Sequence, residues 1–128
     1  MPNTRQTIFT TSMLLLLTAV PAQALDCNNA NTTYEMRECE AIELQKADDL
    51  LNQTYKKIRN DLDDKGKTIL RDAQRAWIVF RDAECERLAD MARGGSIAPL
   101  IRISCITSMT QQRVTDLRLN PMTGELED

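Results

Sequence analysis

The side chains best placed to do chemistry in this sequence are its carboxylates. The chain has no histidine, so the usual general base near neutral pH and the commonest metal ligand are both missing. The chain has 19 carboxylates, and those singled out as candidates lie in two stretches: Glu35, Glu38, Glu40, Glu43, Asp48, Asp49, Asp82, Glu84 and Glu86. Such stretches are typical of a solvated helix face, and the alternative is a hydrolase with two facing carboxylates. We therefore expect no catalytic residue, no cofactor and no metal, and a protein that is not an enzyme.

Four cysteines form the second chemical group: Cys27, Cys39, Cys85 and Cys105. An even number of cysteines in an exported chain favours two disulfides over free thiols. Zinc is the alternative, but the spacings of 12, 46 and 20 residues contain no C-x-x-C pair, and histidine ligands are lacking. The sequence predicts two disulfides.

The most unusual stretch is residues 74–85, which contains the only tryptophan among many charges. Trp77 and Phe80, with Ala73 and Ala83, have the spacing of a core seam on a helix. The alternative is a partner-binding role for the charged residues of this stretch and its tryptophan, namely Arg75, Trp77, Arg81 and Asp82.

Gly94, Gly95 and Ser96 form a second candidate contact site. Two glycines allow a tight protruding turn, and an inhibitor can insert such a loop into the cleft of an enzyme. The simpler alternative is a turn that only connects two helices.

Three helical segments would position these residues. Residues 33–62 lack Pro and Gly, and apolar residues recur there at steps of three and four: Leu44, Ala47, Leu51, Tyr55, Ile58 and Leu62. Thr32 and Glu35 predict a capping box at the start of this helix, and Gly66 predicts a left-handed end. Residues 68–93 form the second predicted helix, which stops at Gly94.

The third helix is expected to start near Ser96 as its cap, with Pro99 in the first turn, and to end before Asn120 and Pro121. Short connections favour antiparallel neighbours. The predicted fold is therefore all-α: an up-down-up antiparallel three-helix bundle stabilised by two disulfides.

The bundle selects among the three possible cysteine pairings. Cys85 and Cys105 lie ten residues on either side of position 95, the tip of the second hairpin, so they are level on neighbouring helices. This leaves Cys27 to pair with Cys39. The other two pairings remain open at this stage.

The amino-terminal residues predict export. An apolar stretch from Ile8 to Val20 is too short to span a bilayer and precedes an A-x-A cleavage site that ends at Ala24. We expect residues 1–24 to be a signal peptide, residues 25–119 to be one helical domain, and residues 120–128 to be a flexible acidic tail. An uncleaved membrane anchor is the alternative. No cysteine stands at the cleavage point, so no lipid anchor is predicted.

The net charge limits the partners. Loss of Arg5 with the signal peptide takes the net charge from −3 to −4. A mildly acidic surface argues against nucleic acid or anionic lipid as a partner, and it suits a basic protein.

Together these residues resemble the LprI-like lysozyme inhibitor family of secreted bacterial domains. The resemblance rests on residues 73–77, 80–85 and 94–96, and on scattered matches: Thr33, Glu35, Cys39, Ala47, Asp48, Leu51, Asn52, Tyr55, Cys105, Thr110 and Arg113. It implies a helical domain of the bacterial envelope, periplasmic or secreted, that inhibits a lysozyme. The alternative is an envelope accessory or assembly module with another partner.

Overall fold

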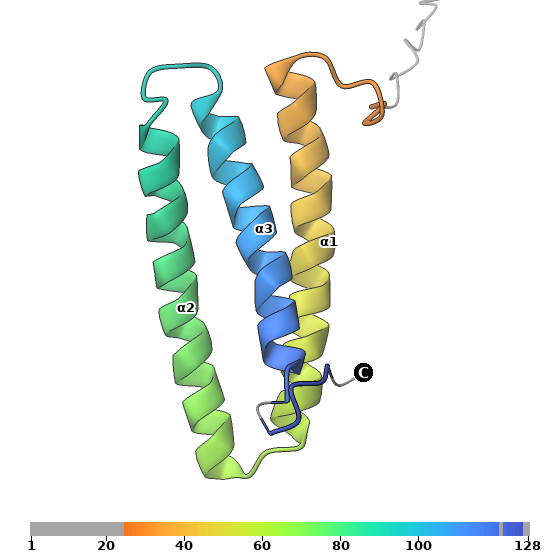
Figure 1. Cartoon of the computed structure of the whole chain (residues 1–128), viewed down its shortest axis with the longest axis vertical. Helices are drawn as coiled ribbons and strands as arrows, with labels where there is room; N and C mark the ends of the chain where they lie inside the picture. The colour runs from red at the N-terminus through yellow and green to blue at the C-terminus, as the bar shows by residue number, and fades with distance from the viewer. Residues whose placement is uncertain (1–24, 121, 127–128) are drawn as a thin grey trace, which may run out of the picture.

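The chain folds into three helices joined by two short turns (Figure 1). A computed structural model describes residues 25–120 and 122–126, with α1 at Thr33–Asn60, α2 at Asp64–Asp90 and α3 at Ala98–Arg118. Successive helices run in opposite directions, which confirms the predicted up-down-up bundle. The predicted signal peptide, residues 1–24, lies outside the described residues.

The third helix is the centre of the bundle. It packs against both α1 and α2, whereas α1 and α2 have few direct contacts with each other (Figure 1). Its buried residues are Ile106, Thr107, Thr110 and Val114. The core is therefore built on two helix–helix interfaces that share α3.

Both predicted disulfides are present. Cys27 is bonded to Cys39 and Cys85 to Cys105, with Cα–Cα separations of 5.6 and 5.5 Å. The first disulfide ties the lead-in segment to α1, and the second joins α2 to α3, with each cysteine ten residues from position 95 in their connecting turn. The pairing predicted from the hairpin geometry is confirmed.

The start of α1 is capped as predicted. The Thr32 hydroxyl accepts a hydrogen bond from the Glu35 amide at 3.1 Å, and the Glu35 carboxylate accepts one from the Thr32 amide at 3.0 Å. This reciprocal pair satisfies two amide groups that have no partner within the helix. The pKa of Glu35 is lowered, chiefly by a hydrogen bond from the Asn31 amide and further by those from Thr32.

Two other predicted helix ends are wrong. Gly66 does not end α1 but lies in the first turn of α2, where its amide donates to the Asp63 carboxylate at 2.7 Å. Asp63 therefore caps α2, which begins four residues before the predicted start. Ser96 does not cap α3, because the residue before that helix is Ile97, without a side-chain cap bond; Pro99 does lie in the first turn, as predicted.

The predicted core seam on α2 is wrong in most of its residues. Phe80 is 59% exposed, and Ala73 and Ala83 are exposed as well. The face of α2 that meets α3 carries Leu70, Gln74, Trp77, Arg81, Cys85 and Ala89. Cys85 fixes this rotation of the helix, because its disulfide holds that residue, fully buried, against α3.

The chain beyond α3 turns back on itself. Leu119 and Leu126 form an isolated antiparallel bridge, and the Asn120 amide donates to the Glu125 carbonyl oxygen at 2.8 Å. The proposed flexibility of residues 120–128, and the domain limits at 25 and 119, remain predictions.

Candidate functional site

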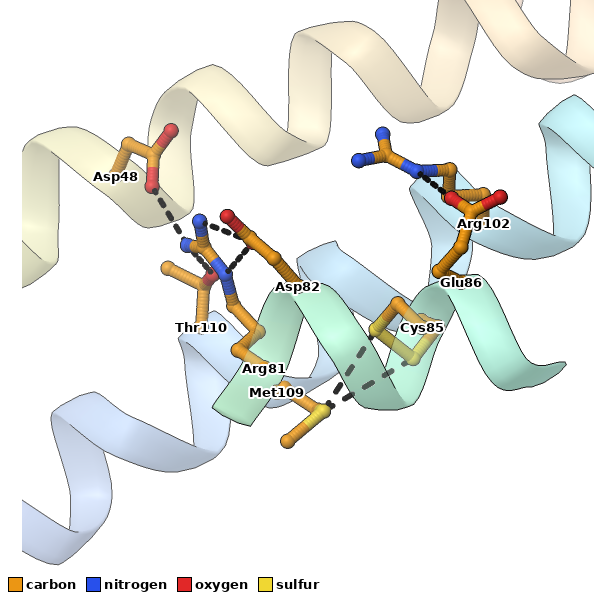
Figure 2. Close-up of polar contacts among 9 residues, drawn as sticks. Asp48, Arg81, Asp82, Cys85, Glu86, Arg102, Met109 and Thr110 are labelled. Carbon is orange, nitrogen blue, oxygen red and sulfur yellow. Dashed lines mark hydrogen bonds and ion pairs between the residues drawn. A yellow bond between two sulfur atoms is a disulfide. The ribbon is translucent and has the colours of Figure 1, made fainter. Parts of the chain in front are cut away.

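Arg81 is the residue that connects all three helices. Its guanidinium donates to the Asp82 carboxylate at 2.9 Å and to the Thr110 hydroxyl at 3.2 Å, and it lies 3.9 Å from the Asp48 carboxylate (Figure 2). Only 14% of its side chain is exposed. Since Thr110 is fully buried, Arg81 supplies the partner that a buried hydroxyl needs. The contact to Asp48 links α2 to α1.

Trp77 lies one turn before Arg81 on the same face of α2. The guanidinium carbons of Arg81 and Arg113 lie 5.1 and 5.6 Å from the centroid of its ring, which are cation–π distances. Arg113 is held in turn by Gln74, whose side-chain oxygen accepts from Nε at 3.1 Å. Trp77 is half-buried, and its ring contacts one cation from its own helix and one from α3.

The buried disulfide continues this interface toward the second turn. The Met109 sulfur lies 3.7 Å from the Cys85 sulfur and 3.9 Å from the Cys105 sulfur, in van der Waals contact (Figure 2). Near the turn, Arg102 of α3 donates to Glu86 of α2 at 2.9 Å. The connecting turn is thus supported by a disulfide and an ion pair.

Arg75 differs from the other charged residues of this stretch. Its side chain is exposed and makes no hydrogen bond or ion pair with any other residue that the structure describes. Of the four predicted contact residues on α2, Trp77, Arg81 and Asp82 lie together, and Arg75 points elsewhere on the helix. Their role in partner binding stays a prediction.

The glycine turn projects from one end of the bundle. Residues 91–97 connect α2 to α3, and Gly94 has a φ of +79°, which side-chain-bearing residues rarely adopt. Two apolar side chains flank the turn in water: Met91 is 80% exposed and Ile97 is 49% exposed. Sequence reasoning missed these two residues, although their position beside the glycines was visible.

The start of α1 lies at the same end of the bundle as this turn (Figure 1). Residues 25–49 contain seven acidic and two basic residues, whereas residues 50–60 contain three basic residues and no acidic one. The negative charge of α1 is therefore concentrated near the glycine turn. A hollow of about 390 Å³ lies toward the opposite end, between α1 and α3, and includes none of the predicted contact residues.

Hydrogen bonds lower the pKa of two carboxylates, one in the lead-in segment and one on α2. The pKa values of Asp26 and Glu84 are lowered, chiefly by hydrogen bonds from the side chains of Asn29 and Arg87 respectively, whereas a general acid needs a raised value. Within residues 25–120 and 122–126, no three His, Cys, Asp or Glu side chains gather into a possible metal site. No helix among those residues is long and apolar enough to cross a bilayer.

Comparison with known proteins gives one family. The model of the family described as lysozyme inhibitor LprI matches residues 26–117. An uncharacterized protein of Rhizobium meliloti (strain 1021) is 31% identical over 122 residues, which cover 82% of this chain and 88% of the relative. No solved structure matches the chain. The residues that match the family model include both disulfides and all three helices except the last residue of α3.

Proposed function

Because this chain belongs to the lysozyme inhibitor LprI family, we propose that it is an exported protein that binds a lysozyme and blocks its cleft. The proposal includes cleavage after Ala24 and release into the periplasm or beyond. Two disulfides in so small a domain suit that oxidising location. The protein itself would not cleave peptidoglycan, and it would act only by occupying the cleft of the lysozyme.

The main support for a lysozyme-binding surface is the exposure of the glycine turn, residues 91–97. Met91 and Ile97 leave apolar area in water on both sides of Gly94 and Gly95, and such area is favourable to bury against a partner. The Cys85–Cys105 disulfide and the Arg102–Glu86 ion pair stiffen the helices below the turn. A stiff support lowers the entropy that is lost when a loop enters a cleft.

The acidic half of α1 supplies the second part of the proposed surface. Opposite charges accelerate encounter and orient the two proteins before contact. A basic lysozyme would be drawn to the end of the bundle that carries residues 25–49 and would meet the glycine turn there (Figure 1). Added salt should therefore slow association more than it speeds dissociation.

The test is lysis of a peptidoglycan suspension by lysozymes of several types, with and without the purified protein. We expect slower lysis in the presence of a molar excess of the protein for at least one basic lysozyme. Unchanged rates for every lysozyme would refute the proposal and leave the accessory module as the better hypothesis.

A loop variant then tests the contact surface. Gly94 is unsuitable because its φ of +79° would be strained in any other residue, and a Cβ on Gly95 would lie 3.1 Å from the Ala92 carbonyl oxygen. Ser96 is exposed and has neither restriction. Ser96→Arg adds bulk and positive charge and should abolish inhibition, whereas Ser108→Arg, the same change at an exposed site on α3, should leave it intact.

A further inference from the structure

The outward face of α2 carries apolar residues that the bundle does not cover. Its outer stripe consists of Ile69, Ala73, Ala76, Phe80 and Ala83, all of which are exposed. Ile69 and Phe80 are each 59% exposed, and the adjacent Val79 is 71% exposed. A helix face that stays in water is normally polar, so this stripe needs a separate explanation.

The spacing of the outer stripe is that of a helix pair. Its residues follow each other at steps of four, three, four and three, which is the heptad pattern of the seam between two packed helices. Three of the five are alanines, which allow two helix backbones to approach closely. Because α3 packs against another face of α2 and α1 has few contacts with α2, none of the three described helices covers this stripe, and it is free to accept a helix from another molecule.

Charge favours a second copy of this chain as that molecule. Residues 64–90 contain six acidic and six basic residues, so two copies of α2 can meet without net repulsion. A basic lysozyme would gain no steering from this neutral helix, whereas it would gain steering from the acidic half of α1. We propose that the protein forms a symmetric dimer in which two α2 helices pack antiparallel along their outer stripes.

The antiparallel arrangement follows from the seam and its flanking charges. When Ala73 of one copy lies against Ala76 of the other, Ile69 lies against Phe80, and both contacts occur twice through the two-fold axis. The same register brings Lys65 opposite Glu86 of the second copy, again twice. A parallel pair would lose this pairing, because it would set Lys65 beside Leu70 and Glu86 beside Met91 of the second copy.

Sedimentation equilibrium of the purified protein tests this dimer. The wild type should be dimeric at tens of micromolar, and Ala76→Glu should raise the dissociation constant by about a hundredfold, because it places a charge at the centre of the seam. Ile42→Glu is the matched control, since Ile42 is 45% exposed on α1, away from the outer stripe. Helical circular dichroism should show that both variants stay folded.

Two outcomes would overturn the dimer. One is a wild type that stays monomeric up to the highest soluble concentration. If the wild type is monomeric and Ala76→Glu also loses lysozyme binding, the outer stripe is assigned to lysozyme. The other outcome is an equal loss of association in Ala76→Glu and Ile42→Glu. Neither a monomeric wild type nor an equal loss of association bears on the proposed inhibition through the glycine turn, whereas loss of lysozyme binding in Ala76→Glu would contradict it.

Discussion

The inward and outward faces of α2 each carry an aromatic residue and an arginine, but the bundle uses them differently. Inward, Trp77 lies under the guanidinium groups of Arg81 and Arg113, and Arg81 has partners on all three helices. Outward, Phe80 is 59% exposed, and Arg75 contacts no charged partner among the described residues. The contrast indicates that the inward residues stabilise the fold and the outward residues are available to partners.

The largest expected effect is at the inward disulfide. Replacing Cys85 and Cys105 together by alanine should lower the free energy of unfolding by at least about 3 kcal/mol, because a 20-residue loop is no longer closed in the unfolded chain. Urea denaturation monitored by circular dichroism measures this loss. Ala83→Ser, on the outward face two residues from Cys85, should change it by less than about 0.5 kcal/mol. Equal urea midpoints for the two variants would contradict the claim that the inward face of α2 stabilises the fold more than the outward face.

The two aromatic residues give the next largest difference. Trp77→Ala should lower the free energy of unfolding by roughly 2 to 3 kcal/mol, because it removes packing between α2 and α3. Phe80→Ala should change it by less than about 0.5 kcal/mol when measured at low protein concentration, where no dimer contributes. The contrast fails if Phe80→Ala proves as destabilising as Trp77→Ala under those conditions.

The two arginines should differ in the same direction. Arg81→Gln should lower the free energy of unfolding by about 2 kcal/mol. The substitution leaves the buried Thr110 hydroxyl and the nearby carboxylates without their charged partner. Arg75→Gln should cost less than about 0.5 kcal/mol. Arg81→Lys should recover only part of the loss, since an ammonium group cannot reproduce the planar contacts of a guanidinium. Thermal melts of the three variants against the wild type would show whether this order holds.

The smallest effect concerns an ion pair at the protein surface. The hydrogen bond from Arg87 lowers the pKa of Glu84 below its ordinary value of 4.5. The stabilisation by this carboxylate is therefore present above pH 4.5 and is lost as the pH falls through the lowered value. The urea midpoint of Glu84→Gln should lie slightly below that of the wild type near neutral pH and converge with it in acid. If the difference between the two urea midpoints grew as the pH fell, the carboxylate would not stabilise the fold in the way described.

Much of the fold could be predicted from the sequence because its signals are local. The capping box at Thr32 and Glu35 needs residues three apart, and the apolar steps of α1 need only one helical period. The pairing of Cys85 with Cys105 followed from their equal distance to the turn. Each of these predictions is confirmed.

Which face of α2 is buried was harder to predict, because the sequence of this helix contains two stripes at helical spacing. The stripe with Ala73, Ala76 and Phe80 is more apolar, whereas the other contains Gln74 and Arg81, which have the character of surface residues. The polar stripe is buried because Thr110 and Arg113, more than 25 residues away, provide its partners. One signal was available: Phe80 lies about 140° around the helix from Cys85, so the predicted disulfide already turned Phe80 away from α3.

The candidate contact surface was only partly visible in the sequence. Gly94, Gly95 and Ser96 mark the turn, but the exposure of Met91 and Ile97 depends on how α2 and α3 end. That the acidic half of α1 lies at the same end of the bundle depends on the antiparallel arrangement of all three helices (Figure 1).

The most direct test of lysozyme binding at the glycine turn is hydrogen–deuterium exchange of the protein with and without a saturating basic lysozyme. We predict slower exchange in residues 91–97 and in the first turns of α1, and unchanged exchange along the outer stripe of α2. Unchanged exchange at the glycine turn in the bound state, or protection confined to the outer stripe, would contradict the proposed surface.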